Sequence, residues 1–101
     1  MPEHPLSPMM KLDPQFMDHL KETDKIVYSD GALPRKVKLL MALAFDAANG
    51  ASDGVRALAQ AAIRAGATKE EIAETVRVAY HLSGVGSVYT AAHGLKEIME
   101  D

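Results

Sequence analysis

Along most of this chain, apolar residues recur at steps of three and four positions, which is the spacing of one face of an α-helix. The first such stretch opens at Asp13-Pro14, where an acidic N-cap precedes a proline suited to the first helical turn. Its apolar residues include Phe16 and Leu20, and we expect a helix from about residue 14 to about residue 27. No alternating strand pattern of useful length occurs, so the predicted fold class is all-α.

A second helix is expected to begin at Leu33-Pro34 and to end at Ala48, and residues 37–48 are apolar at almost every position. A helix that is apolar all round is buried all round. It must therefore be central in the fold or covered by other subunits. Asn49-Gly50 is expected to end it, because both residues tolerate the left-handed conformation at a helix C-terminus.

Three further helices are predicted from start and stop signals in the second half of the chain. Ser52 or Asp53 is expected to cap the third helix. Thr68 and Glu71 have the spacing of a capping box, which predicts the start of the fourth. Residues 83–86, Ser-Gly-Val-Gly, break the pattern before a last helix.

The length of 101 residues is enough for one domain. We expect residues 1–12, which carry three prolines, to be an N-terminal arm without regular structure. Residues 13–101 are then a single domain of about five helices. The end of the arm is apolar, so we expect it to pack on a neighbour rather than to remain in water.

Composition argues against several classes of function. The net charge is -3, which gives no basis for a nucleic-acid partner. Cysteine is absent, which excludes disulfides, thiolate catalysis and cysteine-bound zinc. The sequence has no secretory signal and no apolar stretch of membrane-spanning length, so we expect a cytoplasmic location and no membrane partner. His4 and His19 lack other ligands at metal spacing, so no metal site is expected.

Three segments follow one another in a distinctive order: Ala48-Asn49-Gly50 after the apolar helix, residues 65–72 (Ala-Gly-Ala-Thr-Lys-Glu-Glu-Ile), and residues 83–86. In this order and spacing they resemble the core of the carboxymuconolactone decarboxylase and alkylhydroperoxidase D-like family, over roughly residues 30–99. Gly86 departs from the pattern, because the decarboxylases have proline there. The resemblance implies an alkylhydroperoxidase D-like helical bundle and a homo-oligomer, with a homotrimer or homohexamer expected.

The resemblance also indicates where the family's redox residues would lie. In the redox branch, two cysteines and a histidine follow Asn-Gly, and a glutamate lies twelve positions before the first cysteine. The matching positions here are Ala51 and Gly54 for the cysteines, Leu58 for the histidine and Leu39 for the glutamate. Because these side chains cannot replace a thiolate nucleophile, we predict that thiol peroxidase activity is absent.

The decarboxylase branch of the family also lacks the cysteine pair, and it acts on carboxylated lactones without a metal or organic cofactor. Such chemistry needs cations that hold carboxylates and an acid that delivers a proton. The candidate cations are Arg56 and Arg77, and the candidate proton donors are His81 and His93. One departure is that the decarboxylases carry histidines in the helix corresponding to residues 52–64, where this chain has none.

Two residues stand out against the helical patterns. Asp46 places a charge in the long apolar helix, where an unpaired buried carboxylate is costly, so it either pairs with a neighbour such as Arg56 or faces a pocket. Gly94 lies inside the last helix, at a cost of about 1 kcal/mol relative to alanine, and indicates a close contact between helices. His81 shares its helix face with acidic residues and Arg77, which is typical of a solvated surface but also of a cleft between subunits.

These observations leave two hypotheses about function. The first is a cofactor-independent lyase that acts on a small carboxylated molecule, with Asp46, Arg56 and His81 as catalytic candidates in a pocket between subunits. The second is a non-catalytic oligomeric module that keeps the scaffold and binds a small molecule or a protein. It predicts that Leu39 and Leu58 pack together where the polar relay would lie.

Overall fold

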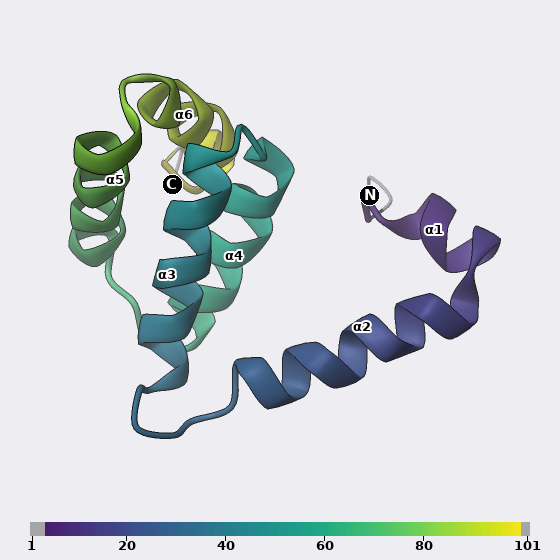
Figure 1. Ribbon diagram of the computed structural model, residues 1–101. Coiled ribbons are helices and arrows are strands. Elements are labelled where there is room, and N and C mark those ends of the chain that lie inside the picture. Colours follow the sequence, from purple (N-terminus) through teal and green to yellow (C-terminus); the bar gives the residue numbers. More distant parts are fainter. Residues whose placement is uncertain (1–3, 100–101) are drawn as a thin grey trace.

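The protein is described by a computed structural model over residues 4–99, and every regular element in that range is a helix (Figure 1). The predicted all-α class is confirmed, with six helices rather than about five. They are α1 Ser7–Leu12, α2 Pro14–Val27, α3 Arg35–Ala48, α4 Ser52–Arg64, α5 Lys69–Ser83 and α6 Gly86–Met99.

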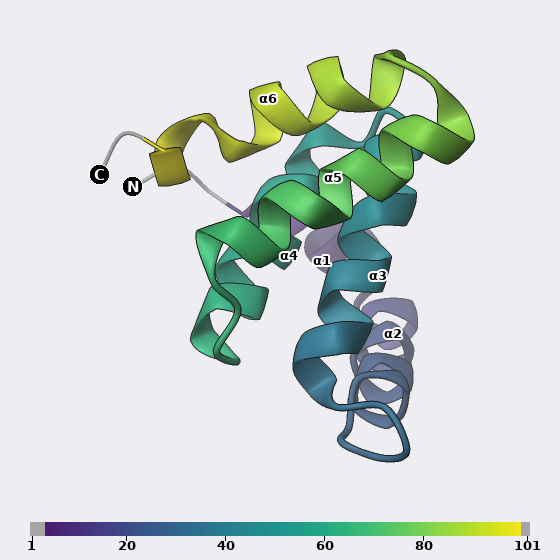
Figure 2. The same ribbon diagram turned by 90° about the vertical axis from the view of Figure 1, so that its left-hand side faces the viewer.

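Helices α3 to α6 form a bundle around α3, which packs against each of the other three. Figure 2 shows α5 crossing in front of α3, with α6 running across the top of the bundle. Leu43 of α3 and Val55 of α4 are the largest fully buried side chains. The remaining core is rich in alanine, which allows the helices to approach closely.

Gly94 of α6 marks such a close approach. A Cβ atom added at this glycine would lie 2.6 Å from the backbone oxygen of Ser52 and 2.8 Å from the Val55 side chain. These distances are shorter than any ordinary contact, so α6 can lie this close to the start of α4 only with glycine at position 94. The contact between helices that the sequence indicated is therefore confirmed.

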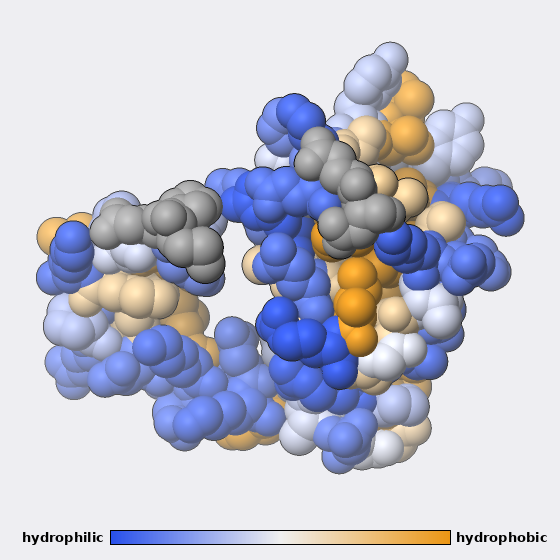
Figure 3. Space-filling view, turned by 180° about the vertical axis from the view of Figure 1, so that it is seen from behind, coloured by the Kyte–Doolittle hydropathy of each residue, from blue (hydrophilic) through white to orange (hydrophobic). Residues whose placement is uncertain are grey.

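Helices α1 and α2 form a separate N-terminal limb, residues Ser7–Val27, that extends away from the bundle (Figure 1). The two helices pack on each other, and neither packs along a helix of the bundle. Figure 3 shows open space between the limb and the bundle. Met17 is the only buried residue of the limb.

The expectation that residues 1–12 lack regular structure is wrong for residues 7–12, which form α1; residues 1–3 lie outside the described range. Pro8 stands in the first helical turn, where the missing N–H group would have no intrahelical partner anyway. The helix closes with a hydrogen bond from Asp13 N to Met9 O (2.8 Å). The Asp13 side chain then caps α2 by accepting a bond from Phe16 N, as the sequence predicted.

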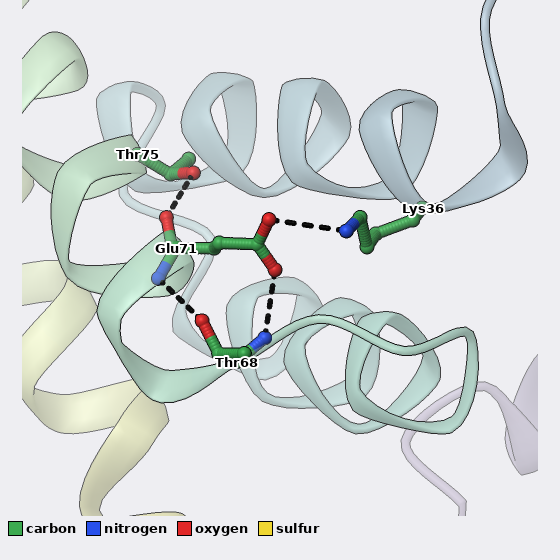
Figure 4. A network of polar contacts seen from close by, with 4 residues as sticks. All are labelled: Lys36, Thr68, Glu71 and Thr75. Atoms are coloured by element: carbon green, nitrogen blue, oxygen red, sulfur yellow. Dashed lines mark hydrogen bonds and ion pairs between the residues drawn. The ribbon is translucent and has the colours of Figure 1, made fainter.

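The predicted capping box at the start of α5 is confirmed (Figure 4). Thr68 Oγ1 accepts a hydrogen bond from Glu71 N (3.1 Å), and Glu71 Oε1 accepts one from Thr68 N (2.9 Å). The second carboxylate oxygen of Glu71 pairs with Lys36 Nζ of α3 at 3.0 Å, which ties the start of α5 to the start of α3. The pKa of Glu71 is lowered, mainly by the hydrogen bond from the Thr68 backbone and next by the hydrogen bond from Lys36.

The expected cap of α4 is not observed. Ala51 is the N-cap residue, and neither Ser52 nor Asp53 caps the helix with its side chain. The tight turn from α3 explains this, because Ala51 N donates a hydrogen bond back to Asp46 O (2.9 Å) and fixes where α4 begins. Gly50 supplies the left-handed conformation that the turn requires, with φ +77.

Helix α3 is central, but its burial is not complete within one protomer. Met41 and Phe45 face outward, and Phe45 is 67% exposed. Its own chain therefore leaves this side of α3 uncovered, and coverage by other subunits stays a prediction. Within residues 4–99, no helix is both long and apolar enough to cross a bilayer.

Candidate functional site

The surface along which α3 packs against α4, called the α3–α4 seam, contains the positions that match the redox residues of the family. Leu39, Leu43 and Asp46 lie on one face of α3, because they are separated by four and three residues. Leu43 packs in the same core cluster as Val55, which places this face of α3 against α4. The α3–α4 seam is therefore formed by the two helices that carry these matching positions.

The Asp46 carboxylate lies directly against the backbone of Gly54 on α4. A Cβ atom added at position 54 would overlap the carboxylate, and it would lie 2.8 Å from Asp46 Cγ and 3.5 Å from Asp46 Cβ. The carboxylate therefore fills the space that a larger side chain at position 54 would need. The redox branch has a cysteine at this position, whereas here an acid from the neighbouring helix occupies the space.

Among the described residues, the Asp46 carboxylate has no ion-pair partner. None of the ion pairs formed within residues 4–99 includes it, and the expected pair with Arg56 is not formed, because Arg56 Nη2 contacts Asp53 Oδ1 at 3.0 Å. Partial burial raises the pKa of Asp46. A carboxyl group in this state is suited to hold and release a proton.

Tyr28, at the end of α2, is the second titratable group connected with this seam. Burial is the main cause that raises the pKa of Tyr28. The carboxylates of Asp24 and Asp46 raise this pKa further, and Arg35 lowers it. The Tyr28 side chain packs on the cluster that contains Leu39. Tyr28 therefore brings a neutral phenol to the edge of the seam, and no pattern in the sequence marked it as a site residue.

Leu39 and Leu58 belong to the same packed cluster, together with Ala62 and Ala67. Leu39 is buried and Leu58 is partly buried. Ala51 adds only a methyl group at the N-cap of α4. Apolar contacts therefore fill the part of the seam where the resemblance places a glutamate and a histidine.

A polar hollow between α4 and α6 brings together two candidates predicted from the sequence, the cation Arg56 and the proton donor His93. Its volume is about 190 Å³, below the roughly 300 Å³ typical of sites for drug-sized ligands, so it suits a small molecule. Lys96 and Glu97 were not predicted as site residues, although both lie on the His93 face of α6 at steps of three and four residues. The full lining is Ser52, Arg56, His93, Gly94, Lys96 and Glu97.

The three catalytic candidates named from the sequence lie in different places. Asp46 is in the α3–α4 seam, Arg56 lines the α4–α6 hollow, and His81 is exposed on α5. Arg77 is exposed on α5 as well. Within one protomer, His81 therefore does not complete a site with the other two. Across the described residues, no group of three or more acidic or histidine side chains is arranged to hold a metal ion.

Comparison with known proteins shows a matching family and a similar solved structure. The sequence profile of the Carboxymuconolactone decarboxylase family matches residues 14–97. Among solved structures, the fold is similar to the apo form of a carboxymuconolactone decarboxylase family protein from Legionella pneumophila, with a TM-score of 0.83 and 29% sequence identity. This similarity covers 94% of the present chain and 85% of the Legionella chain. No curated protein matched the sequence.

Proposed function

The chain belongs to the carboxymuconolactone decarboxylase family, and from this premise we propose that it is a binding module for a small carboxylated molecule, without the thiol chemistry of the redox branch. The observation that carries the proposal is the packing of Leu39 and Leu58 in one apolar cluster. A proton relay needs groups that exchange protons, and neither side chain can do so. The chain has no cysteine that could serve as the nucleophile.

The α4–α6 hollow supports a small anionic ligand. Arg56 can hold a carboxylate with two parallel hydrogen bonds, and Lys96 adds a second positive charge beside it. The present partner of Arg56 is the well-exposed Asp53, and an exposed ion pair of this kind contributes little free energy. A ligand carboxylate can therefore join or replace Asp53 at small cost.

Isothermal titration calorimetry with succinate, adipate and a carboxylated lactone tests this proposal, with the methyl esters as uncharged controls. Arg56→Gln is expected to weaken binding of the acids at least tenfold, because a hydrogen bond to a charged group is worth about 1.5–3 kcal/mol. The matched control is Arg64→Gln, since Arg64 lies on the same helix outside the hollow. Equal affinity for acids and esters, or equal loss in both variants, would contradict the proposal.

The absence of thiol chemistry has its own test. Incubation with hydrogen peroxide and a dithiol is expected to give no turnover above the rate without protein. Protein-dependent turnover with a dithiol would show that another group replaces the cysteines.

A cofactor-independent carboxy-lyase is the second candidate, and Asp46 is the observation that favours it. In this reaction the bond between the substrate carbon and its carboxylate breaks, carbon dioxide leaves, and the electron pair passes into a conjugated enolate. Protonated Asp46 would deliver a proton to that carbon and would then regain one from water. A raised pKa favours the protonated form that this step requires.

Release of carbon dioxide from a carboxylated lactone tests the second candidate. Asp46→Asn should abolish release, because the amide cannot deliver the proton, while Asp18→Asn on the limb should leave it unchanged. Release that survives in Asp46→Asn would exclude the assigned role of Asp46. Binding without any release in the wild type would leave the binding module as the function.

A further inference from the structure

The α4–α6 hollow is lined by side chains of both charges, and this pattern restricts what it can bind. On α4 the lining consists of Ser52 and Arg56, which are four residues apart and lie on one face of the helix. On α6 it includes His93 and, at steps of three and four residues, Lys96 and Glu97. Two positive charges and one negative charge therefore border a single hollow of about 190 Å³.

The charged groups of α6 are paired neither with each other nor with α4. Lys96 and Glu97 are adjacent in sequence, so their side chains do not face each other on the helix. None of the ion pairs within residues 4–99 includes either side chain, and Arg56 pairs with Asp53 on its own helix. The Glu97 carboxylate is therefore available to a cation that enters the hollow, as the Lys96 ammonium group is to an anion.

Two neutral polar groups of the hollow are also available to a ligand. Among the hydrogen bonds found within residues 4–99, none involves the Ser52 hydroxyl or the His93 imidazole. A hydroxyl and a neutral imidazole can each donate and accept hydrogen bonds, so neither group decides the charge of the ligand. That choice is left to the three charged side chains of the lining.

A ligand that carries carboxylates alone matches only part of this lining. Its carboxylates would pair with Arg56 and Lys96, but they would also meet the like charge of Glu97, and like charges brought together at a binding surface oppose binding. A simple amine would pair with Glu97 and would be repelled by the two cations. The ligand that matches all three side chains has two carboxylates and one ammonium group.

We propose that the ligand of the α4–α6 hollow is an acidic α-amino acid, with its carboxylates on Arg56 and Lys96 and its ammonium group on Glu97. This inference rests on the proposed function, because it names the class of carboxylated molecule that the hollow binds. The close approach of α6 to α4 at Gly94 lets one small molecule contact both helices. Glu97 then sets the specificity, because it attracts the amine and repels a dicarboxylate that lacks one.

Isothermal titration calorimetry with matched pairs of ligands tests this inference. L-Aspartate and succinate differ only in the amino group, as do L-glutamate and glutarate. In at least one pair, the amino acid is expected to bind about five- to tenfold more tightly, which is the range between an exposed ion pair and a hydrogen bond to a charged group. N-Acetyl-L-aspartate keeps both carboxylates but has no ammonium charge, so it should lose this advantage.

Substitutions of Glu97 test whether this residue is the source of the preference. Glu97→Gln should remove the advantage of the amino acid over its partner, and Glu97→Lys should reverse it in favour of the dicarboxylate. Glu74→Gln is the matched control, since Glu74 is exposed on α5 and does not line the hollow. Arg56→Gln should weaken both members of a pair, which separates loss of binding from loss of selectivity. Far-ultraviolet circular dichroism checks that each variant is folded.

The possible outcomes distinguish this inference from the proposed function. Equal affinities within both pairs, or a preference for the amino acid that survives in Glu97→Gln, would overturn the inference and leave the proposed function intact. If none of the four acids bound, the proposed function would fail as well. Inorganic phosphate is a further probe, because it has no group for Glu97. Tighter binding of phosphate than of either amino acid would indicate a simple anion site and would overturn the inference.

Discussion

The bundle and the N-terminal limb use apolar residues in opposite ways. In the bundle, small residues bring helices together, as Gly94 does between α6 and α4, and Leu43 and Val55 are fully enclosed. In the limb, large apolar side chains remain at the surface, including Ile26, which is 76% exposed. The bundle therefore encloses its large apolar side chains, whereas the limb leaves several of its own exposed within the single chain.

This difference also separates stability from assembly. Burial inside the bundle contributes to the free energy of unfolding of each protomer. The exposed apolar side chains of the limb gain no such contribution within the single chain, so any burial of them by a binding partner would depend on concentration. Substitutions in the two regions can therefore be told apart by varying concentration.

The largest expected effect follows from Leu43→Ala. This side chain is 0% exposed at the centre of the bundle, and its truncation should lower the free energy of unfolding by about 2–5 kcal/mol at every protein concentration. Ile26→Ala in the limb should change it by less than about 0.5 kcal/mol when the protein is dilute. Urea denaturation at two concentrations measures both. Equal losses in the two variants would remove the distinction between bundle and limb.

Gly94→Ala should give the next largest effect. Alanine is the better helix former by about 1 kcal/mol, but its Cβ would meet the Ser52 backbone and Val55 at 2.6 and 2.8 Å. Overpacking of this kind costs about 1–3 kcal/mol, so a net loss of stability is expected. The control is Gly86→Ala, where nothing lies within 4 Å. A more stable Gly94→Ala variant would mean that α6 can move away from α4 without penalty.

Most of the fold could be predicted because its signals are local. Periodic apolar residues located α2 to α6, and the Thr68–Glu71 capping box marked the start of α5 from two residues alone. The helix that was not predicted, α1, is short and carries Pro8. Proline usually indicates the end of a helix, but it is tolerated in the first turn, where Pro8 lies. The direction of the limb was not predictable either, because it depends on bonds such as the one from Arg35 N to Asp30.

The candidate site was less predictable than the fold because it depends on contacts between helices. Arg56 and His93 were both named from the sequence, but only the close approach of α6 at Gly94 brings them to one hollow. The contact of Asp46 with Gly54 required the turn between α3 and α4 to be known. His81 could be recognised as a surface residue, because its helix face is charged, and the structure leaves it exposed.

Asp46→Asn should give the smallest effect, and its sign is opposite to that of the bundle substitutions. Because burial raises the pKa of Asp46 in the folded state, the ionised form opposes folding, and this penalty appears as the pH rises above the ordinary value of 3.8. The amide removes the charge, so at pH 7 the variant should be more stable than the wild type, by less than about 1 kcal/mol because the group remains partly hydrated. Asp18→Asn in the limb, where the carboxylate is exposed, should show no such gain. Urea denaturation between pH 3 and pH 7 measures both, and a loss of stability in Asp46→Asn at pH 7 would mean that the carboxylate has a favourable partner beyond those that residues 4–99 of one chain supply.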